Sequence, residues 1–271
     1  MRESRSLSSN NEGGRLHLDE PAPGVARLKI SNPGKSGALD HAILDGFATT
    51  VPELDARCLI VTGQDGTFSA GYDIGDLPDA VFADEAERLV AHPFAAAIEA
   101  IEAYQYPTLA ALNGHAIGGG LELALACDLR IAATTVSVGM PPAKLGLVYS
   151  HTGIRKFIDA IGGPRTLELF LLGRRVDSLT ARDWGLVNFV AEPDALGREA
   201  VALAEEIAGN APLAQRGNKR VIRTVLDSHV QLDPALEREL IDLRRACFSS
   251  DDFREGVRAF AEKRRPRWQG R

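Results

Sequence analysis

Three consecutive glycines at residues 118–120 stand between two apolar segments, and this arrangement constrains the fold of the chain more than any other feature. Residues 108–113 before the glycines are short and apolar, which is typical of a buried strand. Residues 121–127 after them indicate a helix, and residues 129–133 indicate another buried strand. Glycine backbone adopts positive φ and approaches ligands closely, and a helix N-terminus favours negative charge. The turn therefore suits an oxyanion, although a plain tight turn is the commoner role of such glycines.

The same alternation of strands and helices begins nearer the N-terminus. Residues 15–30 alternate between apolar and polar side chains around a Pro-Ala-Pro-Gly turn, which predicts a β-hairpin. Residues 40–51 predict a helix and residues 58–63 a buried strand, so this segment is predicted to form a β-α-β unit. A glycine-punctuated loop at residues 68–74 then leads to a long helical stretch. From Gly153 onward the pattern is helical almost throughout, so the fold class is α/β with a C-terminal α-helical region.

Composition excludes several classes of function. A net charge of -6 and a sequence pI near 5.6 argue against a nucleic-acid partner, because such proteins neutralise phosphates with clustered Lys and Arg. The three cysteines are far apart in the sequence and predict neither a disulfide framework nor a zinc site, so we expect no metal. No apolar run has the roughly 18 residues that a membrane span needs, and no nucleotide-binding glycine motif is present. We expect a soluble cytoplasmic protein without a cofactor and without a membrane partner.

Two motifs carry a resemblance to a known family. The sequence Phe-Ser-Ala-Gly-Tyr-Asp-Ile at residues 68–74 is followed by Asn-Gly-His-Ala-Ile-Gly-Gly-Gly-Leu-Glu-Leu at residues 113–123. The pair and its spacing resemble the signature of the enoyl-CoA hydratase/isomerase (crotonase) superfamily, and the likeness covers nearly everything after residue 14. The resemblance implies a crotonase (ClpP-like) spiral of β-β-α units at residues 15–200 and a C-terminal helical trimerisation region at residues 201–271. We interpret residues 1–14, which are polar and lack an apolar signal core, as a disordered tail.

The resemblance also implies a substrate, an assembly and a set of site residues. The substrate is an acyl-CoA thioester, with coenzyme A as part of the substrate, and the assembly is a homotrimer or hexamer. The two oxyanion-hole donors fall on the backbone N–H groups of Tyr72 and Gly119, and Glu122 falls on the first catalytic carboxylate of the hydratases. Contacts to coenzyme A fall on Ala70, Asp73, Ile74 and Lys263.

One position departs from the hydratase pattern. Hydratases carry a second catalytic glutamate after a proline, whereas here that place is Pro142, which has no ionisable group. Hydration needs one carboxylate to activate water and another to help deliver the α proton, so simple hydration is in doubt. Decarboxylation of a malonyl-type thioester needs mainly stabilisation of the enolate oxygen. Residues 145–150 resemble the methylmalonyl-CoA decarboxylase branch, in which a tyrosine at the place of Tyr149 faces the reacting end of the substrate.

Other interpretations stay open at this point. The leading interpretation is an enzyme that decarboxylates methylmalonyl-CoA or a related malonyl-type thioester. The nearest rival among enzymes is an enoyl-CoA hydratase or isomerase that uses Glu122. A rival of another class is a non-catalytic acyl-CoA-binding subunit with the same fold. Glu122 could be an ordinary acid at a helix start, Tyr149 could simply pack, and Lys263 could be an exposed charge. Tyr72 stands where the decarboxylase branch would have a histidine, which leaves the backbone role intact and any role of its side chain open.

Overall fold

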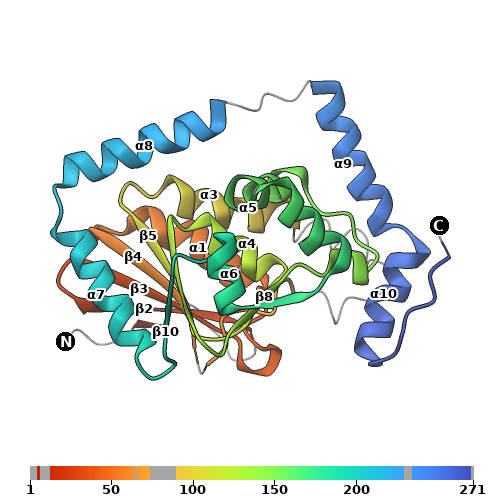
Figure 1. The fold of residues 1–271 in the computed structure, drawn as a ribbon, viewed down its shortest axis with the longest axis horizontal. Helices are drawn as coiled ribbons and strands as arrows, with labels where there is room; N and C mark the ends of the chain where they lie inside the picture. The colour runs from red at the N-terminus through yellow and green to blue at the C-terminus, as the bar shows by residue number, and fades with distance from the viewer. Residues whose placement is uncertain (1–4, 7–12, 65, 74–89, 229–233, 270–271) are drawn as a thin grey trace.

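The computed structural model describes residues 5–6, 13–64, 66–73, 90–228 and 234–269, and it shows a large sheet, a small sheet and surrounding helices (Figure 1). Within these residues the larger sheet has seven strands in the order β1-β2-β3-β4-β5-β7-β10. They are β1 (Arg5–Ser6), β2 (Arg15–Ala22), β3 (Val25–Ser31), β4 (Cys58–Gly63), β5 (Thr108–Leu112), β7 (Leu129–Ala133) and β10 (Phe189–Ala191). β2 and β3 form the predicted antiparallel hairpin, and β3, β4, β5, β7 and β10 are parallel neighbours.

The N-terminal segment contributes one short strand to this sheet. β1 pairs antiparallel with β2, with Arg5 opposite Leu18 and Ser6 opposite His17. These two residues belong to the segment that the sequence predicted to be a disordered tail, and the neighbouring residues 1–4 and 7–12 lie outside the described part of the chain.

A small second sheet gives the fold its spiral form. It consists of β6 (Ala116–Ile117), β8 (Ser137–Gly139) and β9 (Arg175–Asp177). The chain runs from β5 through β6 into helix α4 (Gly119–Ala126), and from β7 through β8 toward helix α5 (His151–Leu172). β4 is followed in the same way by Ser69, which forms an isolated bridge with Ala116. Three successive units therefore pass from the large sheet to the small one, which confirms the predicted spiral of β-β-α units.

Helices cover the sheet and bury its apolar strands, which are buried on both faces as parallel strands require. α1 (His41–Thr50) is capped by Asp40, whose carboxylate accepts from the N–H of Ile43 at 2.9 Å. Figure 1 shows α1, α3 (Ala95–Ala103), α4 and α5 gathered above the sheet, and α7 (Leu196–Gly209) contacts β3, β4, β5 and β7. Short turns of other helix types are η1 (Pro33–Lys35), η2 (Val51–Glu53), η3 (Val90–Phe94) and η4 (Pro142–Lys144).

The C-terminal helices confirm the predicted helical region. The helices after α5 are, in order, α6 (Ser178–Trp184), α7, α8 (Pro212–Ser228), α9 (Pro234–Phe248) and α10 (Asp251–Ala261). In Figure 1, α8 runs along the top of the molecule and α9 descends at the right toward α10. In the described part of the chain, no helix combines the length and the apolar character that crossing a membrane would take.

The sequence pattern missed two strands in this second half. We predicted helix almost throughout after Gly153, whereas β9 and β10 interrupt the helices. Each strand has three residues, which is too short to show the alternation that identifies a strand. α5 itself contains a break, because Gly162 leaves the helical region with φ 70° and ψ 167°.

Candidate active site

The two glycine turns lie directly against each other. The loop after β4 is held on one side by hydrogen bonds from the N–H of Leu39 to the carbonyl of Gly71 (2.7 Å) and on the other from the N–H of Ile117 to the carbonyl of Ser69 (3.0 Å). Gly71 has φ 100°, and a Cβ at this position would lie 2.9 Å from the carbonyl oxygen of Ile117 and 3.4 Å from the nitrogen of Gly119. Only glycine allows this approach without strain, so the backbones of both predicted oxyanion donors are neighbours.

The turn before α4 provides hydrogen-bond acceptors for the N–H groups around Gly119 but not for that of Gly119 itself within the described residues. Gly118 has φ 56° and donates its N–H to the carbonyl of Gly139 at 2.9 Å, while the N–H groups of Leu121 and Glu122 bond to the carbonyl of Gly118. Gly119 is the first residue of α4, so its N–H has no helical acceptor. No partner for this N–H is found within the described residues. A donor at a helix N-terminus is suited to bind an anionic oxygen.

The side chains of three predicted site residues meet beside these turns, including that of Tyr72, for which only a backbone role was predicted. Glu122 lies in the first turn of α4 and is 4% exposed, and the Tyr149 hydroxyl donates to its Oε2 at 2.5 Å. The hydroxyl of Tyr72 lies 3.1 Å from that of Tyr149. The Tyr72 ring also packs edge to face on Phe94 with ring centres 4.8 Å apart. The structure therefore joins Tyr72, Tyr149 and Glu122 into one hydrogen-bonded group.

The surroundings of this group affect its electrostatics. Burial raises the pKa of Tyr149 well above its usual value, and the negative charge of Glu122 adds to the effect. Glu122 Oε1 also lies near the first turn of α5, since a Cβ on Gly153 would meet it at 3.0 Å. Ser150 caps α5 by accepting from the N–H of Gly153 at 3.0 Å. The positive N-terminal ends of α4 and α5 thus both favour negative charge at this carboxylate.

Pro142 occupies a buried turn close to the same site. It begins η4, three residues after Gly139, and the carbonyl of Gly139 is the acceptor for the N–H of Gly118. The turn at which the sequence resemblance predicted a second glutamate in hydratases therefore lies beside the Gly118–Gly120 turn, but here it carries Pro142 and provides no carboxylate. Glu122 is the buried carboxylate that the described residues offer at this site.

The predicted coenzyme A contacts are less closely grouped. Ala70 is exposed, and its N–H donates to the carbonyl of Ser36 at 3.1 Å. The Asp73 carboxylate is paired with the Lys35 ammonium at 3.0 and 3.1 Å, a contact that the sequence did not indicate. Lys263 is exposed beyond the end of α10, and no described contact joins it to Tyr72 or Tyr149. Ile74 lies outside the described residues. The assignment of all four residues to coenzyme A binding stays a prediction.

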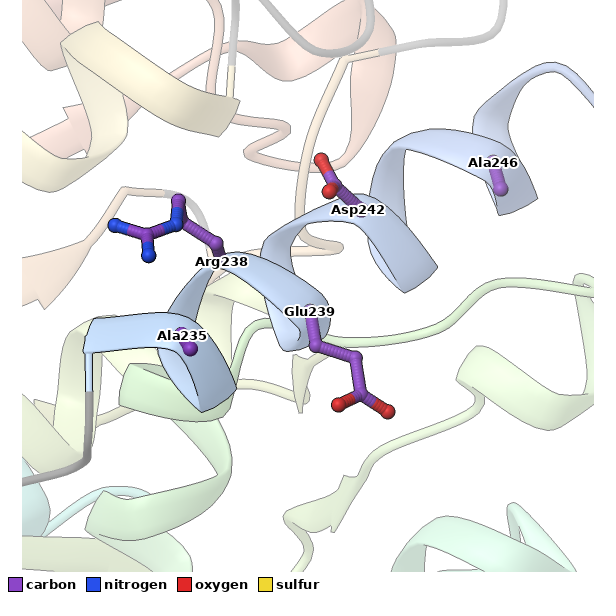
Figure 2. Close-up of a pocket in the computed structure, with 5 residues that line it drawn as sticks. All are labelled: Ala235, Arg238, Glu239, Asp242 and Ala246. Carbon is purple, nitrogen blue, oxygen red and sulfur yellow. The ribbon is translucent and has the colours of Figure 1, made fainter.

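A hollow lies along α9 (Figure 2). It has a volume of about 530 Å³, and the described residues that line it all belong to α9: Ala235, Arg238, Glu239, Asp242 and Ala246. α9 touches the first turn of α5 nearby, where His151 Nε2 lies 3.7 Å from Glu237 Oε1. None of these five residues is among the described site residues that the sequence predicted.

The spiral fold and the two apposed backbone turns define a class of protein, the crotonase-superfamily enzymes that act on acyl-CoA. The family model described as enoyl-CoA hydratase/isomerase matches residues 20–271, and the chain belongs to this family.

Individual relatives differ in their reactions. A probable enoyl-CoA hydratase of Mycobacterium tuberculosis is 34% identical, covering 91% of this chain and 95% of its own. A carnitinyl-CoA dehydratase of Salmonella typhi is 33% identical, covering 94% of this chain and 98% of its own. A solved structure of methylmalonyl-CoA decarboxylase complexed with 2S-carboxypropyl CoA is similar with a TM-score of 0.85 and 27% identity, covering 97% of this chain and 100% of that one.

Proposed function

We propose that this enzyme is a lyase that decarboxylates methylmalonyl-CoA or a related malonyl-type thioester. The observation that carries the proposal is that the described residues of the site include one buried carboxylate. This is Glu122, which is hydrogen-bonded to Tyr149, and Pro142 stands where a second catalytic carboxylate was expected for a hydratase. The likeness to the structure of a methylmalonyl-CoA decarboxylase supports it.

The proposed reaction needs little beyond these groups. The bond between the α-carbon and the carboxylate breaks, its electron pair passes into the thioester as an enolate, and carbon dioxide leaves. The N–H groups of Tyr72 and Gly119 would stabilise the charge that develops on the thioester oxygen. Protonated Glu122 would donate to Tyr149, whose own proton would then face the substrate carboxylate and hold it out of the enolate plane. The helix ends favour a charged Glu122 in the empty site, whereas the carboxylate of a bound substrate would repel that charge, so the proposal places a proton on Glu122 in the reacting complex.

A panel of thioesters tests this function. Malonyl-, methylmalonyl-, ethylmalonyl- and crotonyl-CoA would each be incubated with the purified enzyme, with carbon dioxide release and loss of the enoyl absorbance followed in parallel. We expect carbon dioxide release from at least one malonyl-type thioester to be the fastest reaction. Release no faster than the uncatalysed rate from all three would overturn the proposal.

The absent second carboxylate gives a prediction of its own. We expect hydration of crotonyl-CoA by the wild type to be slow or undetectable, because one of the two acid/base groups is missing and each contributes roughly a hundredfold or more. We expect Pro142→Glu to raise the hydration rate, and Pro142→Gln is the matched control that adds the same bulk without the acid. Rapid hydration by the wild type, unaffected by these changes, would contradict the prediction.

The relatives favour a second candidate function. Those with the higher sequence identities carry names of enoyl-CoA hydratases and of a carnitinyl-CoA dehydratase, and their chemistry adds or removes water at an acyl-CoA. On this alternative, Glu122 would serve as the acid/base group with a partner other than Pro142. The crotonyl-CoA arm of the same panel separates the two candidates.

We also propose that the enzyme is a homotrimer or hexamer, assembled through its C-terminal helices. α8 has its polar face toward its own core: Lys219 pairs with Asp128 at 2.7 Å, and Arg223 pairs with the same carboxylate at 2.8 Å. Its outer face is apolar and exposed, at Leu213, Val221, Ile222, Val225 and Leu226. A helix that presents its apolar side outward is explained by burial against another copy.

Charge on this outer face is expected to break the assembly. Ile222 is 59% exposed in the single chain, and Ile222→Asp should shift the sedimentation profile to smaller species because a buried carboxylate without a partner is costly. Thr224→Asp adds the same charge at an exposed polar position of the helix and is the control. If Ile222→Asp left the profile of a wild-type oligomer unchanged, or if the wild type were already a monomer, α8 would not be the interface.

The cysteines support a cytoplasmic location. Cys58 and Cys127 are free and buried. Burial raises the pKa of both thiols to about 12, so they stay protonated and unreactive. Unpaired thiols fit a reducing compartment.

A further inference from the structure

The hydroxyl of Tyr72 is a polar group that the proposed reaction does not use. It contacts the hydroxyl of Tyr149 at 3.1 Å, and Tyr149 in turn contacts Glu122 at 2.5 Å. Glu122 and Tyr149 are 4% and 7% exposed, whereas Tyr72 is half-buried. The three groups therefore form a line that starts at a buried carboxylate and ends at a more accessible phenol.

The hydrogen bonds along this line have a defined direction when Glu122 is ionised. A carboxylate only accepts, so the Tyr149 hydroxyl donates its single proton to Glu122. The Tyr149 oxygen can then only accept from Tyr72, so Tyr72 is the donor in the 3.1 Å contact. In this state the Tyr72 oxygen can itself take up a proton as it passes its own proton to Tyr149. When Glu122 is protonated and donates to Tyr149, the single Tyr149 proton can face the substrate carboxylate and, once that group has left, the Tyr72 oxygen.

The Tyr72 ring lies beside the place where the thioester oxygen would be held. A Cβ on Gly119 would be 2.7 Å from Tyr72 Cε1 and 3.0 Å from both Cδ1 and Cζ. The side chain of one oxyanion residue thus lies against the backbone of the other. Because the α-carbon is bonded to the carbonyl carbon of the thioester, an acyl group bound between the two N–H groups would have its α-carbon near the Tyr72 phenol.

We propose that the Tyr72 hydroxyl exchanges a proton with the α-carbon of the bound acyl group, and that Tyr149 relays this proton to and from Glu122. The inference rests on the proposed function only in that the enolate arises by loss of carbon dioxide. Tyr72 is then a catalytic residue in its own right, through its side chain as well as its backbone.

The proton balance follows directly. After carbon dioxide leaves, the α-carbon takes the Tyr72 proton, the Tyr72 oxygen takes the Tyr149 proton, and the Tyr149 oxygen takes the proton of Glu122. The new carbon–hydrogen bond uses the electron pair of the enolate, and Glu122 is left as a carboxylate that regains a proton from solvent. The three transfers occur together, because burial beside Glu122 disfavours a separate tyrosinate at Tyr149. Each turnover consumes one proton, as the conversion of a malonyl-type thioester to its saturated product requires.

Exchange of α-protons with solvent tests the relay without decarboxylation. Butyryl-CoA would be incubated with enzyme in deuterated water and its deuterium content measured by mass spectrometry. Tyr72→Phe keeps the ring, its contact with Phe94 and the backbone N–H, so it removes the hydroxyl alone. We expect about a tenfold or larger loss of exchange, and a comparable loss in Glu122→Gln, from removal of one acid/base relay. The double variant should be no slower than the slower single variant, because the residues act as one unit.

A matched control variant and a parallel assay separate loss of the relay from loss of folding, of coenzyme A binding or of decarboxylation. Tyr106→Phe removes the phenol oxygen of a ring that lies under the Arg216 guanidinium, 5.7 Å from the ring centre and outside the site, and it should leave exchange unchanged. Calorimetry with coenzyme A and a thermal melt would show that each variant binds and folds. Three results would overturn the relay: exchange within twofold of wild type in Tyr72→Phe, losses that multiply in the double variant, or no exchange by the wild type. Carbon dioxide release is measured in parallel and tests the decarboxylase function separately. Tyr72-dependent exchange in an enzyme that releases no carbon dioxide would support the relay and reject the decarboxylase.

Discussion

Replacing Gly119 with proline is expected to reduce turnover of the best thioester by at least about a hundredfold, because loss of one oxyanion donor costs roughly 3 to 4 kcal/mol of transition-state stabilisation. The N–H of Gly119 is the first of α4 and has no partner within the described residues, so it is available to the substrate. Proline removes this donor while remaining compatible with the first position of a helix. The expected loss therefore falls on catalysis more than on the helix.

Two further variants separate the lost donor from the added bulk. Any Cβ at Gly119 meets the Tyr72 ring at 2.7 Å, so Gly119→Ala displaces the ring while keeping the N–H, and it should retain more activity than Gly119→Pro. Gly197→Pro places proline in the first turn of α7, where a Cβ meets nothing within 4 Å, and it should behave like wild type. Rates would be measured on variants with unchanged thermal melts. A folded Gly119→Pro enzyme with wild-type kcat/KM would remove Gly119 from the oxyanion hole.

Tyr149→Phe should lower carbon dioxide release from methylmalonyl-CoA by tens-fold or more, since one hydrogen bond to a charged group contributes about 1.5 to 3 kcal/mol. The change deletes one oxygen and keeps the ring, which packs edge to face on Phe170 with centres 5.6 Å apart. It also breaks the line from Glu122 to Tyr72, so the loss combines the orientation of the departing carboxylate with the delivery of the proton.

Stability must be measured beside this rate. Glu122 is buried and loses the Tyr149 donor, which costs roughly 1 to 3 kcal/mol of folding free energy. A thermal melt and calorimetry with coenzyme A would show whether the folded fraction and the affinity are preserved at the assay temperature. If a folded, CoA-binding Tyr149→Phe enzyme released carbon dioxide at the wild-type rate, Tyr149 would have a packing role only, and the hydratase or isomerase function would take first place.

Local pattern predicted much of the fold. The hairpin β2–β3, helix α1 with its buried Ile43, Leu44 and Phe47, and strands β4, β5 and β7 all lie within a residue or two of the predicted ranges. These elements have clear periodicity and clear turn residues at their ends. The spiral itself came from the family resemblance, because β6 and the Ser69 bridge are too short to be recognised from the residues alone.

Contacts between distant parts of the chain were the least predictable. Tyr72 and Tyr149 are separated by 77 residues, and nothing in either motif indicates that their hydroxyls meet. The pairing of Lys35 with Asp73 is of the same kind, since it depends on how η1 approaches the loop after β4. The resemblance assigned Glu122 and Tyr149 separately, whereas their hydrogen bond depends on the packing of α4 against the start of α5.

The last helix supports the segment that carries Tyr149. A Cβ on Gly256 of α10 would lie 2.3 Å from the carbonyl oxygen of Leu145, and one on Gly146 would lie 2.8 Å from the carbonyl oxygen of Asp252. The backbone of α10 therefore packs directly against the backbone of residues 145–146, and this contact holds the segment that leads to Tyr149 in place. Residues that are translated late thus complete a site whose chemical groups are translated early. A nascent or clipped chain that lacks α10 would keep every proposed catalytic side chain and still leave Tyr149 without its support.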